Sequence, residues 1–256
     1  MNTWTIVRVS ATTKDGSIGV KGETGYVSST CYIRPDVHEL VLDVEKGILH
    51  DVRKSPTHVG RDRDVLFVDE GLLDCYTCEA TRTIGQNITL AGSGIVSEWC
   101  VGDVLSFCSS SNPEGPQVVV TSCRKPCPKN SVVHGAGTQQ RMMSTGSGGV
   151  FARIMRGGTV RPGDCVKLLS RPQPRWPCTL VHRLLLGDLL TSDPAVLQEL
   201  ATLEFLEKPR YQDRAIQLLK QAQNRHQPCY QRACLVAIGV AVVFSLSRLI
   251  YRQHRS

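Results

Sequence analysis

The sequence predicts a mainly β protein, with a β-barrel core followed by a small helical C-terminal region and one transmembrane helix. Short β-branched runs separated by Gly and Pro turns fill the first 170 residues, a pattern typical of a barrel and not of a doubly wound sheet. Amphipathic segments follow, and a charge-free run lies near the C-terminus. We therefore divide the chain into residues 1–170, 171–228 and 229–256.

Each predicted element of the barrel rests on its local pattern. The expected strands, which carry β-branched or alternating residues, cover residues 3–10, 38–44, 65–68, 104–107, 118–121. Two Gly turns predict a hairpin within residues 19–33, and residues 70–80 predict a short helix. Residues 134–145 are rich in Gly, Gln and Ser and predict a loop. The Gly-Asp pairs at 102–103 and 163–164 predict turns that serve barrel geometry.

The C-terminal third has a different composition. Three prolines in residues 171–177 predict a stiff linker. The sequence Ser192-Asp193-Pro194 predicts a helix start. Two amphipathic helices are then expected, interrupted at Pro209. The pattern leaves open whether these helices pack on the barrel or mediate self-association.

The charge distribution argues against a nucleic-acid partner. The net charge is +7, but residues 221–256 contain five Arg and no acidic residue, so the other 220 residues carry only +2. A nucleic-acid-binding domain normally concentrates its basic residues on one folded face. Here much of the basic character belongs to the C-terminal segment.

The eleven cysteines are an odd number, and the start of the chain lacks the apolar core of a signal peptide. Reduced thiols are therefore expected. Cys75 and Cys78 form a C-x-x-C pair, which together with Cys123 and Cys127 could form a four-thiolate zinc site. Cysteines three apart on a helix also commonly just fill a buried face.

A Lys-Pro-Cys sequence follows the buried strand expected at residues 118–121. Pro126 and Pro128 fix φ on both sides of Cys127 and remove two backbone donors, so the chain there forms a stiff loop. Three cations flank the thiol: Arg124, Lys125, Lys129. They favour the thiolate, which is the form that binds metal or attacks an electrophile.

This Lys-Pro-Cys sequence, together with GGVFARIMRGGTVRPGD at residues 148–164, resembles the MOSC domain, which takes its name from the C-terminal domain of molybdenum cofactor sulfurase. Further similar motifs precede it in the family's order: HDVR at 50–53, GRDRDVLFVD at 60–69, GQNIT at 85–89, VGDVL at 101–105. The resemblance covers roughly residues 5–169 and is greatest to the short, stand-alone members.

The resemblance implies a molybdenum cofactor (molybdopterin) and identifies residues for it. Cys127 would be the metal ligand and the catalytic residue. The implied cofactor-binding residues, which are charged or amide side chains, are Asp51, Asp62, Arg63, Asn87, Arg124, Lys129. The chain departs from the family pattern where His50 replaces Gly, Gln86 replaces Glu and Ser131 replaces a second Cys. Arg53 is also displaced by one position. Pyridoxal phosphate is not expected, since its chemistry belongs to a different domain of the sulfurase.

The C-terminal run predicts a membrane anchor. Residues 233–247 are free of charge, and the apolar stretch extends to residue 251 if Arg248 snorkels. Basic residues flank it on both sides. We expect a tail anchor with the globular part facing the cytosol, and the short, doubly basic tail is typical of mitochondrial outer-membrane proteins.

These observations leave three functions open. The first is a membrane-tethered molybdenum-cofactor protein that reduces N-hydroxylated substrates and requires an electron-donor protein. The second is a non-enzymatic carrier of the cofactor or of sulfur. The third is a structural membrane protein that kept the barrel without the site.

Overall fold

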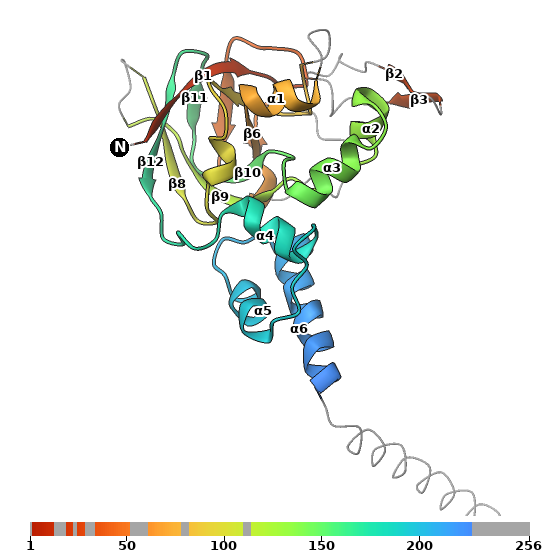
Figure 1. The fold of residues 1–256 in the computed structure, drawn as a ribbon. Helices are drawn as coiled ribbons and strands as arrows, with labels where there is room; N and C mark the ends of the chain where they lie inside the picture. Colours follow the sequence, from red (N-terminus) through yellow and green to blue (C-terminus); the bar gives the residue numbers. More distant parts are fainter. Residues whose placement is uncertain are drawn as a thin grey trace, which may run out of the picture.

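The computed structural model describes residues 2–12, 19–22, 25–28, 34–51, 61–77, 82–109 and 114–226. Its centre is a closed barrel in which the strands follow the order β1-β12-β8-β9-β10-β6-β7, and β1 pairs with β7 to close it (Figure 1). The strands are β1 (Thr3–Val9), β6 (Val65–Asp69), β7 (Ile88–Leu90), β8 (Val104–Cys108), β9 (Gln117–Cys123), β10 (Val150–Arg156), β12 (Cys165–Ser170). The predicted barrel is confirmed.

Two smaller sheets accompany the barrel. One contains β11 (Gly158–Val160), β4 (Leu40–Asp43) and β5 (Gly47–Ile48), and the other is the hairpin of β2 (Gly19–Gly22) and β3 (Gly25–Ser28). The strand expected at residues 38–44 and the hairpin expected within 19–33 are therefore confirmed.

Strand β9 forms where the sequence concentrates β-branched residues, and Val118 through Cys123 are all buried. It pairs with β8 on one side and with β10 on the other, and Cys123 lies opposite Val150. The end of β9 thus lies beside the start of β10. The chain leaves the barrel there and enters the Lys-Pro-Cys loop.

Helices α1 (Glu70–Tyr76), α2 (Lys129–His134) and α3 (Thr138–Thr145) lie near this end of the barrel (Figure 1). The prediction of a loop at residues 134–145 is wrong, because α3 covers most of this range. Its sequence has no amphipathic pattern. Gly137 and Gly146 have positive φ at its two ends, and Met142 is buried against Val68 and Ile84. Tertiary packing stabilises this helix.

The C-terminal helices are α4 (Cys178–Leu185), α5 (Pro194–Ala201) and α6 (Asp213–His226), with a π-helical turn η5 (Lys208–Gln212) before α6. Asp193 caps the start of helix α5, and its carboxylate accepts from the N–H of Ala195, at the helix start that the sequence predicted. The three helices gather below the barrel, and α6 runs away from it (Figure 1). Their apolar residues share one core with the barrel, so these helices pack on it.

The expectation of reduced thiols is wrong for one pair, because Cys108 and Cys165 form a disulfide. These residues face each other on β8 and β12, and their Cα atoms lie 5.2 Å apart. This proximity depends on the strand register, which cysteine counting does not reveal. The other cysteines in the described ranges are free: Cys75, Cys100, Cys123, Cys127, Cys178.

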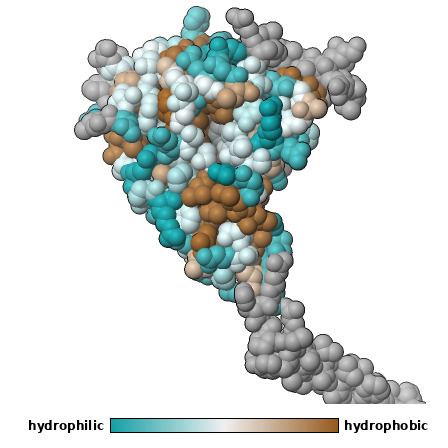
Figure 2. Space-filling view, in the orientation of Figure 1, coloured by the Kyte–Doolittle hydropathy of each residue, from teal (hydrophilic) through white to brown (hydrophobic). Residues whose placement is uncertain are grey.

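Across the ranges given above, no helix is long and apolar enough to cross a membrane. The predicted anchor at residues 233–251 lies outside the described residues, as do Arg53 and Cys78. Figure 2 shows an apolar area over the C-terminal helical part of the molecule, below the barrel. Leu189 and Leu190, which follow α4, are both exposed.

Candidate functional site

Cys127 lies on the loop that joins β9 to α2, and its side chain is half-buried. Asn130 holds this loop: its Oδ1 accepts from the backbone N–H of Cys127 at 3.3 Å and lies 3.7 Å from the Cys127 Sγ. The Nδ2 of Asn130 donates to the Sδ of Met142 at 2.9 Å. Sequence analysis missed Asn130, although an Asn three residues after a turn residue is a common local hydrogen-bonding signal.

The three predicted cations lie around this loop in different ways. Arg124 donates from Nη1 to the carbonyl of Ile84, and its backbone N–H donates to Gly149 at 2.9 Å. Lys125 is exposed and Lys129 is half-buried. The three basic residues therefore flank the thiol in the sequence, and the Arg124 guanidinium is directed to the turn at Ile84.

Cys123 occupies a contrasting environment four residues earlier. It is buried, its Sγ–H donates to the Gly146 carbonyl at 3.2 Å, and burial raises the pKa of this thiol far above its usual range. Burial likewise raises the pKa of Cys178. Buried, protonated thiols are inert toward metals and electrophiles. This contrast favours Cys127 as the functional thiol.

Asp51 and Asn87 lie in a second, buried cluster. Arg34 donates from Nη1 to both carboxylate oxygens of Asp51, at 2.5 and 2.6 Å. The Oδ1 of Asn87 accepts from the N–H of Leu66 at 3.1 Å, and its Nδ2 donates to the Ser10 carbonyl at 3.3 Å. The structure thus gives both predicted residues internal partners, and their predicted contact with a cofactor stays a prediction.

Asp62 and Arg63 lie in a third place, on the 3₁₀ helix η2 (Arg61–Arg63). The Nε of Arg153, on β10, donates to Asp62 at 3.0 Å. The Nε of Arg63 lies 3.2 Å from Glu207, a residue from the C-terminal helical part. The predicted Asp-Arg pair therefore makes ion pairs to two different elements.

The turn at residues 82–87 connects the first two clusters. It receives the Arg124 guanidinium at Ile84, and the His134 Nε2 lies 2.9 Å from the Thr83 carbonyl. Burial lowers the pKa of His134, a shift that its contact with Thr83 opposes. Gln86 accepts from the N–H of Ile84 and so shapes the turn. Sequence analysis missed His134, which lies at the end of α2.

The zinc alternative gains no support in the part of the chain that is described, where no group of three or more His, Cys, Asp or Glu could hold a metal. Cys75 is exposed on α1, and Cys123 is buried in the core. Because Cys78 lies outside the described residues, the complete four-thiolate set stays a prediction.

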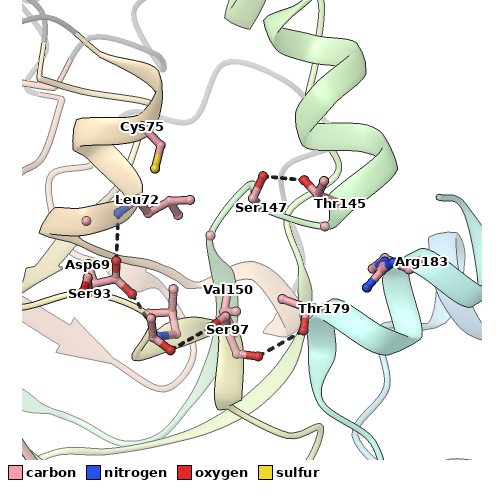
Figure 3. Close-up of a pocket in the computed structure, with 15 residues that line it drawn as sticks. Asp69, Leu72, Cys75, Ser93, Ser97, Thr145, Ser147, Val150, Thr179 and Arg183 are labelled. Atoms are coloured by element: carbon pink, nitrogen blue, oxygen red, sulfur yellow. Dashed lines mark hydrogen bonds between the residues drawn. The ribbon is translucent and has the colours of Figure 1, made fainter. Parts of the chain in front are cut away.

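A pocket of about 390 Å³ lies beside the start of β10, between α1, α3 and α4 (Figure 3). Cys75 of α1, Ser147 after α3 and Thr179 of α4 line it. Several of its polar groups bond to one another or to nearby backbone: Thr145 and Ser147 lie 2.7 Å apart, and Thr179 donates to the Ser97 carbonyl at 3.0 Å. None of the residues predicted to bind the molybdenum cofactor lines this pocket.

The cysteine loop fits an anionic, sulfur-ligated metal group. Cys127 offers a soft ligand with solvent access, and Arg124, Lys125 and Lys129 can offset negative charge. The structure therefore combines a closed β-barrel with a thiol-bearing loop, rich in basic residues, at one end. A family model described as the MOSC domain matches residues 54–167, and this part of the chain is a MOSC domain. This family is associated with the molybdenum cofactor.

Solved structures share the fold. The structure of YiiM from Geobacillus stearothermophilus is 17% identical, with a TM-score of 0.61, and the match covers 84% of this chain and 99% of that one. YiiM from Escherichia coli is 18% identical, with a TM-score of 0.58, and the match covers 91% and 98% of the two chains. A structure described as a hypothetical protein is 19% identical, with a TM-score of 0.59, and the match covers 88% and 89%. A comparison with curated proteins gives no match.

Residues 1–170 are about two thirds of the chain, so matches that cover 84% or more extend beyond the barrel into the C-terminal helices. The shared fold therefore includes the helices that pack below the barrel. At these identities the likeness concerns the fold alone.

Proposed function

We propose that the protein binds a molybdenum cofactor through the Cys127 thiolate and, tethered to a membrane by its C-terminal segment, reduces N-hydroxylated substrates. The observation that supports this proposal is the environment of Cys127. It is a half-buried free thiol between two prolines on a cationic loop, whereas Cys100, Cys123 and Cys178 are buried.

Each residue of the loop has a role in this proposal. The Cys127 thiolate is a soft ligand suited to a soft metal centre. Arg124, Lys125 and Lys129 offset the negative charge of the cofactor's phosphate and orient it. Asn130 fixes the loop through its bond to the Cys127 N–H. When bound, the cofactor supplies a redox-active metal, and an electron-donor protein supplies the electrons.

Two pairs of predicted residues support the site from a distance. Asp51 and Asn87 hold the strand ends beside the turn that receives Arg124. Asp62 and Arg63 hold β10 and the C-terminal helical part in place. The membrane tether rests on residues 233–251, and we propose the mitochondrial outer membrane as its location, with the barrel facing the cytosol.

The test compares Cys127→Ser with Cys123→Ser in the full chain, purified anaerobically in detergent from cells that make the cofactor. Serine at position 123 can still donate to the Gly146 carbonyl, so this matched variant keeps the local hydrogen bond. Bound molybdenum is measured by mass spectrometry, and bound pterin by its fluorescent oxidation products. Cys127→Ser should lose molybdenum by about tenfold or more, as ligand-shell changes do, while Cys123→Ser retains it.

Other outcomes favour other functions. Equal metal loss in both variants, together with bound zinc, would support the four-thiolate site. Cofactor retention without turnover of an N-hydroxylated base, with an artificial electron donor, would support the carrier. Wild-type protein with neither metal nor pterin would leave the structural membrane protein as the remaining function.

A further inference from the structure

The segment at residues 207–211 binds three consecutive residues at the end of β9. The Glu207 N–H donates to the Thr121 carbonyl at 3.3 Å. The Ser122 hydroxyl donates to Glu207 Oε2 at 2.8 Å, and the Tyr211 hydroxyl donates to the Cys123 carbonyl at 2.7 Å. The Lys-Pro-Cys loop begins at the next residue. Residues 207–211 therefore hold the end of β9, after which the Cys127 loop begins.

Residues 205–212, which include this segment, contain several features that are unfavourable on their own. Phe205 has φ of 65°, which is rare for a bulky residue. A π-helical turn, uncommon and often found at functional sites, covers Lys208–Gln212. The Glu207 side chain is 1% exposed and faces Arg63, and burial raises the pKa of its carboxyl group. Such features persist where surrounding contacts determine the conformation, and they concentrate at functional positions.

Tyr211 is also connected to the other end of the loop. Its hydroxyl lies 2.8 Å from His182 Nδ1, and His182 Nε2 lies 2.8 Å from the Met143 carbonyl of α3. The neighbouring Met142 accepts from Asn130, which holds Cys127. Contacts thus run continuously from Tyr211 to both ends of the loop, through β9 on one side and through α4 and α3 on the other.

We propose that Tyr211 and Glu207 are positioning residues for Cys127, and that α6, which continues from them, is coupled to the Cys127 loop. The role of the loop as a ligand site rests on the proposed function, but the coupling does not. Displacement of α6 alters the hydrogen bonds that Glu207 and Tyr211 make to β9. It thereby changes the exposure of Cys127.

The test uses the full chain without cofactor and two variants that each remove one bond to β9, Tyr211→Phe and Ser122→Ala. The control is Tyr76→Phe, which removes a comparable hydroxyl bond, 2.6 Å to Ser147, far along the chain from this segment. The rate of Cys127 alkylation by iodoacetamide is measured at peptide level, relative to N-acetylcysteine. Deuterium uptake by residues 124–134 is measured in parallel. Both measurements are made well below each variant's melting temperature.

Each β9 variant should raise the Cys127 alkylation rate about fivefold, because the loss of one hydrogen bond increases the population of the loosened loop by about that factor. Each should also raise deuterium uptake by residues 124–134. Tyr76→Phe should leave both unchanged. A merely structural role would lower the melting temperature without changing either readout in the loop.

The proposal is overturned if both β9 variants keep the wild-type alkylation rate, or if Tyr76→Phe raises it equally. If Tyr211→Phe does not fold, Ser122→Ala alone decides. Because no cofactor is present, the result is independent of molybdenum retention. Wild-type protein that retains no metal would refute the proposed function and leave the coupling intact.

Discussion

Replacing Asp51 with Asn is expected to destabilise the fold by about 3–5 kcal/mol, the effect of removing one partner from a buried ion pair. The side chains of Asp51 and Arg34 are 0% and 9% exposed, and Arg34 contacts both carboxylate oxygens. Asn has nearly the same size, so the substitution leaves no cavity. It leaves the Arg34 guanidinium buried without its counter-charge and turns an amide N–H₂ toward it.

The magnitude follows from the burial of this pair. The Arg183–Asp188 pair offers a contrast, because its side chains are 37% and 43% exposed, and exposed ion pairs contribute little to stability. Asp188→Asn is therefore the matched control. For a chain of this size, 3–5 kcal/mol corresponds to a fall of about 6–20 °C in melting temperature.

Urea unfolding, followed by tryptophan fluorescence, measures the difference. Trp99 is fully buried and packs edge-on against Phe67, so its emission reports loss of the core. Arg34→Gln combined with Asp51→Asn should recover part of the loss, because the double variant leaves no unpaired buried charge.

Unchanged stability of Asp51→Asn would refute this reasoning. If molybdenum retention falls while the unfolding midpoint stays at the wild-type value, Asp51 acts directly on the cofactor, as the family resemblance implies. If both fall together, the ion pair acts on the site through the fold.

Three further predictions concern other parts of the molecule. Burial raises the pKa of Cys178, so its contribution to stability is complete below the unfolded thiol pKa near 8.5 and falls by about 1.4 kcal/mol per pH unit above it. Cys178→Ala should remove that contribution from the pH slope of urea midpoints measured between pH 8 and pH 10, whereas Cys123, whose pKa is also raised by burial, keeps its own contribution. Gly149→Ala should unfold at lower urea than Gly94→Ala. Both have positive φ, but a Cβ at 149 would lie 2.6 Å from a carbonyl of β6, whereas nothing lies within 4 Å at 94; equal midpoints would contradict the clash. Asp placed at Val240 and Val243 should release the protein from membranes in alkaline carbonate, since each charge costs about 2.5–3.5 kcal/mol at a helix centre. Intact protein in the soluble fraction would mean that the tail does not insert.

Much of the fold follows from local patterns. The β-branched run of β9, the alternation in β4 and the Asp193-Pro194 helix start each depend on neighbours along the chain, and the structure has each element where the sequence predicts it. Helix α3 is different, because its polar sequence carries no period. It forms because Met142 packs in a buried cluster and glycines end the helix on both sides.

The candidate site divides in the same way. Sequence alone identified Cys127, its flanking prolines and the cations beside it, because these are consecutive residues on one loop. Only the tertiary structure decided that Asp51 faces Arg34 and that Arg63 faces Glu207. The positions of charged residues in the sequence follow no periodic pattern from which their ion-pair partners could be predicted. Closure of the barrel and packing of the C-terminal helices bring together positions that are far apart in the chain, and that packing also brings Tyr211 to the base of the Cys127 loop.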